Sequence, residues 1–184
     1  MTRAAVLGTG AWGSVFAGVL ADAGNDVILW GNDEPANAEI NERHTNTGFS
    51  GDRVFPDSVR ATVDAEEAFT GADLLFVALP AQSVREIVGE HAALVPRGAA
   101  VASLMKGIEV GSHMRMSEVL AEVWGIEQER LAVVSGPNLA IEIAQRQPTA
   151  TVVASTSPAT AKRVADAIAS SYFRPYTNPD VVGV

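Results

Sequence analysis

The stretch Ala4-Ala5-Val6-Leu7-Gly8-Thr9-Gly10-Ala11-Trp12-Gly13 decides the fold. Four apolar residues, typical of a buried strand, run directly into the pattern G-x-G-x-x-G. The first glycine of this pattern permits a tight turn, the second lets the backbone approach a pyrophosphate, and the third lets a helix pack close to the strand. A helix candidate follows at residues 12–23 and a second strand candidate at 26–30. This context favours a dinucleotide-binding strand–helix–strand unit over glycines that serve only a tight turn.

The rest of the chain alternates in the same way. Further strand candidates are residues 59–62, 73–79, 99–104, 131–135, 149–154 and 172–177. Helix candidates are residues 35–43, 65–70, 82–95, 114–124, 139–145 and 158–170, and residues 44–57 are irregular, as in a surface loop or a flap. Strands that are apolar throughout are buried on both faces, as in parallel sheets. We therefore predict one dinucleotide-binding domain over residues 1–184, with a Rossmann-like, doubly wound α/β fold whose mostly parallel sheet has helices on both faces.

Composition narrows the classes of function. The chain has 184 residues, no cysteine and a formal net charge of −9. The absence of cysteine excludes disulfides and thiolate metal sites, and no metal site is expected. The acidic balance argues against nucleic acid or an anionic membrane as a partner, and no apolar run approaches the roughly 20 residues that span a bilayer. A cytoplasmic protein is the simplest interpretation, and any phosphate that it binds needs local donors.

Right-handed crossovers place the carboxyl ends of parallel strands at one edge of the sheet, where ligands bind. We call this the carboxyl edge. The loops expected there are Gly8–Gly13, Gly31–Asp33, Pro80–Gln82, Lys106–Glu109 and Gly136–Asn138. Trp12 and Trp30 are expected to pack around the nucleotide pocket at this edge.

The end of the second strand, Trp30-Gly31-Asn32-Asp33, bears on the choice between NAD and NADP. An acidic residue at this place accepts hydrogen bonds from the ribose 2′-hydroxyl, whereas a basic residue favours the 2′-phosphate. Asp33 lies 20 positions after Gly13, so the chemistry favours NAD. The alternative is that Asp33, just before Glu34-Pro35, caps the next helix.

Two further loops carry polar groups. Lys106 directly follows a core strand at the carboxyl edge, so its ammonium is a candidate partner for a phosphate, a nicotinamide amide or a substrate oxygen. Ser135-Gly136-Pro137-Asn138 begins a helix, and its free N–H groups favour an anion or a carbonyl, although a plain helix start has the same sequence pattern. His44 and His91 are interpreted as surface or packing residues, and His113, near the edge, is a weak candidate for an acid or base.

Together these segments resemble the bacterial-type NAD(P)-dependent glycerol-3-phosphate dehydrogenases, over the whole chain. The blocks that carry the resemblance are Gly8–Gly13, Leu29-Trp30, Val77–Pro80, Lys106-Gly107-Ile108-Glu109, Ser135–Ala140 with Glu142, and Tyr176–Val184. The blocks that begin at Lys106 and Ser135 are the specific ones, because many dehydrogenases share the glycine loop.

The resemblance implies a reversible hydride transfer between the nicotinamide and C2 of dihydroxyacetone phosphate, which gives sn-glycerol 3-phosphate for phospholipid synthesis. It implies that Lys106 contacts both cofactor and substrate, as a positioning and electrostatic group, and that Gly136 and Asn138 contact the substrate. The cofactor-binding residues that we predict are Gly8, Gly10, Ala11, Trp12, Gly13, Asn32, Asp33, Pro80, Lys106 and Ala140. Family members often carry His or Arg at the positions of Asn32 and Asp33, which sets this chain apart.

In the family an all-helical domain with the main proton-donating lysine follows the position of Val184. We therefore expect this polypeptide to bind dinucleotide, to turn over little dihydroxyacetone phosphate and to self-associate through exposed apolar surface, with a homodimer as one candidate state. Two alternatives stay open at this point. One is another β-hydroxy acid dehydrogenase, of the 6-phosphogluconate or ketopantoate reductase type, and the other is a dinucleotide-binding sensor without chemistry.

Overall fold

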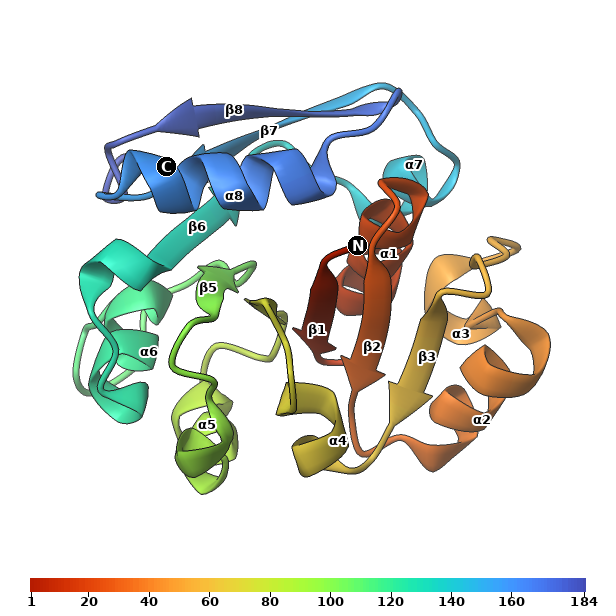
Figure 1. Ribbon diagram of the computed structural model, residues 1–184, viewed down its shortest axis with the longest axis horizontal. Coiled ribbons are helices and arrows are strands. Elements are labelled where there is room, and N and C mark those ends of the chain that lie inside the picture. Colours follow the sequence, from red (N-terminus) through yellow and green to blue (C-terminus); the bar gives the residue numbers. More distant parts are fainter.

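Strand β1 (Arg3–Leu7) lies inside an eight-stranded sheet with the order β3-β2-β1-β4-β5-β6-β7-β8 (Figure 1). The structure is a computed structural model that describes residues 1–184. The other strands are β2 (Asp26–Trp30), β3 (Val59–Thr62), β4 (Leu74–Val77), β5 (Ala100–Ser103), β6 (Leu131–Ser135), β7 (Thr149–Ala154) and β8 (Phe173–Asn178). Strands β1 to β6 are mutually parallel, whereas β7 pairs antiparallel with β6 and β8 pairs parallel with β7. The predicted mostly parallel, doubly wound sheet is confirmed.

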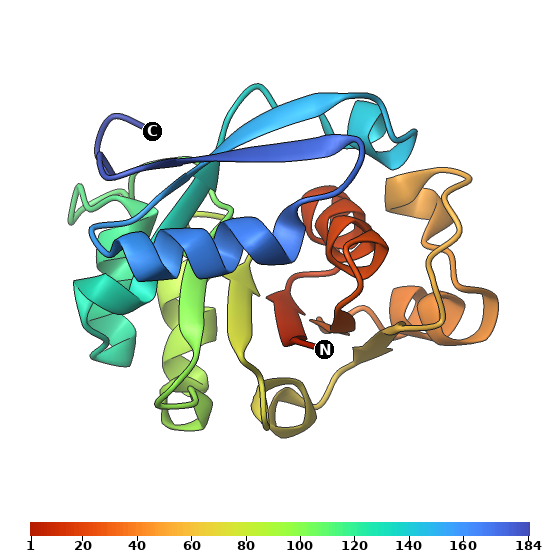
Figure 2. The same cartoon turned by 45° about the horizontal axis from the view of Figure 1, so that its top comes forward.

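The helices cover both faces of this sheet (Figures 1 and 2). They are α1 (Ala11–Asp22), α2 (Glu34–Arg43), α3 (Thr47–Ser50), α4 (Ala65–Phe69), α5 (Val84–Glu90), α6 (Met116–Trp124), α7 (Ala140–Ala144) and α8 (Pro158–Ile168), with 3-10 turns at Ala92–Leu94 and Gln128–Arg130. None of them combines the length and the apolar composition that crossing a bilayer requires.

Alternate residues of β1 supply two separate cores, because successive side chains of a strand point to opposite faces. Ala4 and Val6 join the core under α1, α7 and α8, whereas Ala5 and Leu7 join the core under α4, α5 and α6. Phe16 is the centre of the first core, fully buried, with its ring centroid 5.1 Å from that of Phe76. The inner strands β1, β4 and β5 therefore bury both faces, which is why they are almost wholly apolar, whereas the edge strand β3 alternates buried residues with half-buried Arg60 and Thr62.

One expectation about local structure, for residues 82–95, was wrong, and another, for residues 44–57, was incomplete. Residues 82–95 do not form one helix, because α5 ends at Glu90 and the 3-10 turn Ala92–Leu94 follows. At this end the carbonyl oxygen of Val88 accepts from the N–H of His91 and from Nε1 of Trp124 (2.8 Å). Residues 44–57 contain the short helix α3 and are not a plain surface loop. Asn46 and Arg53 of this segment are buried, and their polar contacts attach it to α1.

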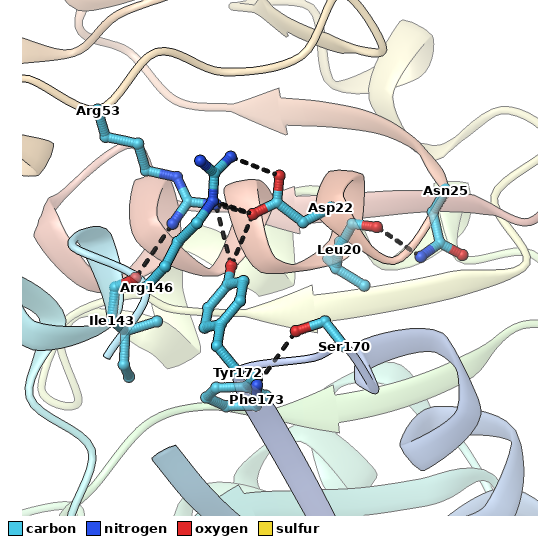
Figure 3. Close-up of polar contacts among 9 residues, drawn as sticks. All are labelled: Leu20, Asp22, Asn25, Arg53, Ile143, Arg146, Ser170, Tyr172 and Phe173. Atoms are coloured by element: carbon cyan, nitrogen blue, oxygen red, sulfur yellow. Dashed lines mark hydrogen bonds and ion pairs between the residues drawn. The ribbon is translucent and has the colours of Figure 1, made fainter. Parts of the chain in front are cut away.

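The strongest of these attachments is a cluster of charged groups around Asp22, at the end of α1 (Figure 3). Arg53 donates to its carboxylate at 2.8 Å, Arg146 donates through two nitrogens at 3.1 Å each, and the hydroxyl of Tyr172 donates at 2.8 Å. Arg53 also donates to the carbonyl oxygen of Ile143 in α7, at 3.2 Å. One carboxylate thus joins α1, the 44–57 segment, α7 and the start of β8.

Burial by itself raises the pKa of Asp22, but the hydrogen bonds from Arg146 and Tyr172 and the charges of Arg53 and Arg146 lower it by more, so that it lies below the ordinary value of 3.8. Burial also raises the pKa of Tyr172, which keeps its hydroxyl protonated as a donor. A carboxyl group whose pKa is lower in the folded state stabilises the fold above its unfolded-state pKa. This stabilisation is lost as the pH falls through the folded-state value.

We predict that Asp22→Asn lowers the free energy of unfolding by about 3 kcal/mol at pH 7, because it leaves the buried guanidinium of Arg53 without its counter-ion. The penalty should shrink as the pH falls below 3.8, because the unfolded wild-type chain then gains a proton on this carboxyl group that the folded chain takes up only at lower pH. Urea unfolding of both proteins at pH 7 and pH 3 measures this. Asp166→Asn, which breaks the exposed pair with Lys162, is the control and should cost less than about 1 kcal/mol. An Asp22→Asn penalty that is equal at both pH values would contradict the prediction.

Candidate functional site

The glycine loop joins β1 to α1 by contacts between backbones. Gly8 has φ +117°, and a Cβ added to it would lie 2.5 Å from the carbonyl oxygen of Ala78. A Cβ on Gly13 would overlap the carbonyl oxygen of Gly8 itself. The start of α1 therefore packs directly on the ends of β1 and β4, and no side chain fits between them.

The N-terminus of α1 is left open by the same arrangement. Gly10 is the residue before the helix and has no side chain to cap it, so the first N–H groups of α1 face the carboxyl edge unpaired. A Cβ added to Gly10 would meet nothing within 4 Å. Open space in front of free N–H groups and the positive end of a helix dipole is suited to an anion.

A residue outside the glycine pattern braces this loop. Asn46 donates through Nδ2 to the carbonyl oxygen of Thr9 (3.1 Å) and to Oγ of Ser14 (2.9 Å). Ser14 in turn donates to the same carbonyl oxygen of Thr9, at 2.9 Å. Residues 44–57, predicted as a surface loop or a flap, therefore stabilise the conformation of the glycine loop through Asn46.

A cleft of about 670 Å³ lies where the loops after β1, β2 and β4 meet. Its walls contain seven of the predicted cofactor-binding residues, namely Gly8, Gly10, Ala11, Trp12, Asn32, Asp33 and Pro80. Trp30, also expected at the nucleotide pocket, lines the cleft too. Gly13 is not, because it is buried beneath the loop against Gly8. The cleft is also lined by residues that were not predicted as site residues, namely Phe49, Ser83, Ile87, Glu90 and His91.

His91 was interpreted as a surface or packing residue, and packing is confirmed. Its ring lies edge-on to that of Trp30, with 4.8 Å between centroids, and both side chains line the cleft. His113, the histidine expected nearest the edge, is exposed at a turn with φ +60° and lines neither this cleft nor the hollow beside it. The position of His91 had no sequence signal, because it depends on where the helix after β4 ends.

Asp33 caps a helix and also lies in the wall of the cleft. Its Oδ1 accepts from the backbone N–H of Ala36 at 3.0 Å, which caps α2, and Pro35 lies in the first turn. The residue also lines the cleft. The acidic side chains of the lining are those of Asp33 and Glu90, and no lysine or arginine is among the lining residues.

A second hollow of about 340 Å³ continues from the cleft and shares four wall residues with it, Ala11, Trp12, Ala78 and Leu79. Its other walls are mostly apolar and include the predicted Ala140, and its polar residues are Lys106 and Asn138. Lys106 donates from Nζ to the carbonyl oxygen of Gly136 at 2.9 Å. The three substrate-contact residues implied by the resemblance thus lie together at one end of the combined space.

The polar groups of this hollow differ in their freedom. Asn138 donates through Nδ2 to the carbonyl oxygen of Ala150 (3.0 Å) and accepts from the hydroxyl of Thr151 (2.9 Å), so its amide is fixed by the protein itself. The ammonium group of Lys106 has three donors and uses one of them. A cation with free donors beside apolar walls can stabilise negative charge on a carbonyl or phosphate oxygen.

We predict that Gly13→Ala and Gly10→Ala differ sharply in stability. Gly13→Ala should lower the free energy of unfolding by about 1–3 kcal/mol, because the added methyl group overlaps backbone that cannot move aside. Gly10→Ala should leave it nearly unchanged, because its Cβ meets nothing and its φ of −70° suits any residue. Thermal unfolding of both variants measures the difference, and equal losses would contradict the packing described for the loop.

Comparison with known proteins agrees with the geometry. Residues 3–161 match the family described as NAD-dependent glycerol-3-phosphate dehydrogenase N-terminus. A glycerol-3-phosphate dehydrogenase [NAD(P)+] of Frankia casuarinae is 52% identical over 183 residues, which cover 100% of this chain and 54% of the relative. One from Mycobacterium tuberculosis is 49% identical over 179 residues, covering 97% of this chain and 54% of the relative. The chain thus spans about half the length of the curated relatives that it matches.

Solved structures of dehydrogenases superpose on this chain. The glycerol-3-phosphate dehydrogenase of Coxiella burnetii superposes with a TM-score of 0.91 at 30% identity, over 99% of this chain and 55% of that one. A UDP-D-ManNAc dehydrogenase from Pyrococcus horikoshii superposes with a TM-score of 0.70 at 17% identity, over 98% of this chain and 47% of that one, which shows a shared fold alone.

Proposed function

The chain belongs to the NAD-dependent glycerol-3-phosphate dehydrogenase family, in the part that the family description calls the N-terminus, and from this premise we propose that it forms the dinucleotide-binding half of such an enzyme. The reaction proposed is the NAD(P)H-dependent reduction of dihydroxyacetone phosphate to sn-glycerol 3-phosphate. The observation that carries the proposal is the continuous space that runs from Asp33 past the open N-terminus of α1 to Lys106.

The residues present fit a nicotinamide dinucleotide. The space that a Cβ on Gly10 would fill lies in front of the free N–H groups of α1, which would hold the pyrophosphate. Asp33 would accept from a ribose hydroxyl, and Trp30 and His91 would form the wall beside it. The apolar second hollow would hold the nicotinamide and exclude water. The bound cofactor would supply the hydride.

Lys106 would act on the substrate. In a chain with a net charge of −9, an anionic substrate needs a local cation, and Lys106 is the cation that lines the second hollow. Its unused donors would bind a phosphate oxygen or polarise the carbonyl that receives the hydride. Asn138, already fixed by Ala150 and Thr151, would present a rigid edge of the hollow to the substrate.

We further propose that NAD(H) is preferred over NADP(H). The cleft has Asp33 and Glu90 in its walls and no lysine or arginine. A 2′-phosphate would meet these two carboxylates without a counter-ion, whereas a 2′-hydroxyl would find an acceptor in Asp33. A cytoplasmic location, a homodimeric state and a role in phospholipid synthesis stay predictions from the sequence and the family resemblance.

Fluorescence titration tests the dinucleotide site. Trp12 and Trp30 line the cleft, whereas Trp124, the last residue of α6, is buried outside it and should give a constant background. NADH should quench the emission saturably, and Gly10→Ala, which retains the fold, should lower the affinity for NADH by about tenfold or more because its methyl group occupies the pyrophosphate space. Saturable quenching that is equally strong in Gly10→Ala would place the dinucleotide elsewhere. No quenching by either nucleotide would reject the binding function of this chain.

Variants at Asp33 separate its two roles. Asp33→Asn keeps an amide oxygen that can cap α2 but removes the charge, so we expect unchanged stability, a roughly three- to tenfold weaker affinity for NADH and a higher affinity for NADPH. Asp33→Ala should also lose about 1 kcal/mol of stability, since the cap is gone. Titrations with both nucleotides and urea unfolding provide the two readouts. An unaltered NADH-to-NADPH preference in Asp33→Asn would leave Asp33 with the capping role alone.

A further inference from the structure

Residues 106–115, which follow β5 and lead into α6, form a small hairpin that begins with Lys106. We call it the lysine hairpin. Inside it, the N–H of Glu109 donates to the carbonyl oxygen of Met114 (2.9 Å), and Ile108 and Arg115 form a β-bridge. Gly107, with φ +135°, turns the chain directly after the lysine. The direction of the Lys106 side chain therefore depends on how the hairpin as a whole is held.

Two side chains from the start of α5 hold it. Gln82 donates through Nε2 to the carbonyl oxygen of Ile108 and accepts from the N–H of Val110, both at 2.9 Å, which replaces the pairing of a neighbouring strand. Arg85 forms a bidentate pair with Glu109, with Nε and Nη2 each 2.9 Å from one carboxylate oxygen. The hairpin is thus attached to α5 on both its backbone and its one buried carboxylate.

Glu109 is unusually enclosed for a charged residue. It is 8% exposed, and its second carboxylate oxygen also accepts from the hydroxyl of Ser112. The hydrogen bonds from Arg85 and then from Ser112 lower the pKa of Glu109. A buried carboxylate with this many donors fixes geometry, because its loss would leave a guanidinium and a hydroxyl without their acceptor.

Arg85 has a second partner that serves as an internal comparison. Its Nη1 lies 2.6 Å from the carboxylate of Glu122 in α6. The side chain of Glu122 is half exposed, and its hydrogen bond to Arg85 lies outside the lysine hairpin. The same guanidinium therefore has one carboxylate partner in the hairpin and one outside it.

Neither Arg85 nor Glu109 lines the cleft or the second hollow. Their neighbours do, since Ser83 and Ile87 of the α5 region line the cleft and Lys106 lines the hollow. The Arg85–Glu109 pair therefore links the α5 region, which lines the cleft, to the lysine hairpin, which lines the second hollow, without itself lining either. A contact in this place acts on a ligand through the residues that it positions.

We propose that Glu109 is a positioning residue, which through its bidentate pair with Arg85 holds the lysine hairpin so that the ammonium of Lys106 rests on the carbonyl oxygen of Gly136. The placement of the ammonium stands on the contacts of the chain itself, and its importance for a phosphorylated substrate rests on the proposed function. Without the pair the hairpin turns more freely about Gly107, and Lys106 loses its fixed position at the nicotinamide end.

The chain has only two lysines, so amine reactivity measures this placement directly. Lys106 and Lys162 are each labelled by brief exposure to an acetylating N-hydroxysuccinimide ester, and mass spectrometry of peptides gives the ratio of their rates, with Lys162 on α8 as the internal standard. Glu109→Gln should raise the relative rate at Lys106 by about three- to tenfold, the protection expected from one hydrogen bond of ordinary net strength. Glu109→Asp, which keeps the charge, should show a smaller rise.

Glu122→Gln is the matched control, because it removes the same charge from the same guanidinium and should leave the ratio within about twofold of the wild type. Circular dichroism establishes that each variant is folded, and if Glu109→Gln is not, Glu109→Asp carries the test. The proposal would be overturned if a folded Glu109 variant had the same ratio of labelling rates, Lys106 to Lys162, as Glu122→Gln.

A second arm separates this inference from the proposed function. In the wild type, sn-glycerol 3-phosphate added with NADH should protect Lys106 and not Lys162, and the protection should weaken in Glu109→Gln. If the wild type shows no protection while the free-chain ratios still separate Glu109→Gln from Glu122→Gln, the substrate assignment fails and the positioning role stands. If sn-glycerol 3-phosphate protects Lys106 equally in the wild type and in Glu109→Gln, Glu109 does not affect substrate binding, and that part of the proposal is rejected.

Discussion

The contact of backbone on backbone at the glycine loop is the constraint on which the remaining structure depends. Because Gly13 lies against the carbonyl of Gly8, and Gly8 against that of Ala78, helix α1 starts at the sheet surface without an intervening side chain. Its axis then runs along the sheet and delivers Phe16 to the core and Asp22 to the charged cluster. The same contact leaves the helix N-terminus facing the carboxyl edge, so the packing of α1 and the proposed pyrophosphate site share one cause.

Much of the fold was predictable because it is determined by short-range pattern. The apolar runs gave the strands, and parallel topology followed from their burial on both faces. The misjudged segments are those shaped by distant partners. The carbonyl oxygen of Val88, near the end of α5, accepts from Trp124, 36 residues away, and Asn46 is fixed by Ser14, 32 residues away. Hydrophobic periodicity depends on neighbouring residues and carries no information on such distant contacts. It therefore could not predict the division of residues 82–95 or the packing of residues 44–57.

The residues of the candidate site likewise fall into those that local sequence pattern predicts and those that distant contacts place. The glycine loop, Asp33, Lys106 and Asn138 were predictable, since each follows a strand and must reach the carboxyl edge. Phe49, Glu90 and His91 were not, because they enter the cleft from segments whose course depends on tertiary contacts. The family membership also disfavours the sensor and the other β-hydroxy acid dehydrogenases as descriptions of this chain, while the similarity to more distant dehydrogenases extends to the fold alone.

The order of the strands has a consequence for the growing polypeptide. The buried residues of the core under α4, α5 and α6 all lie at or before Leu131. The core under α1 includes Phe173, and the carboxylate of Asp22 accepts a hydrogen bond from Tyr172. During synthesis from the N-terminus, one face of the sheet can therefore be complete while the other still lacks α8 and β8. Helix α1, among the first elements made, keeps an uncovered apolar side until translation has passed 170 residues, which makes this face the part of the nascent chain most in need of protection from aggregation.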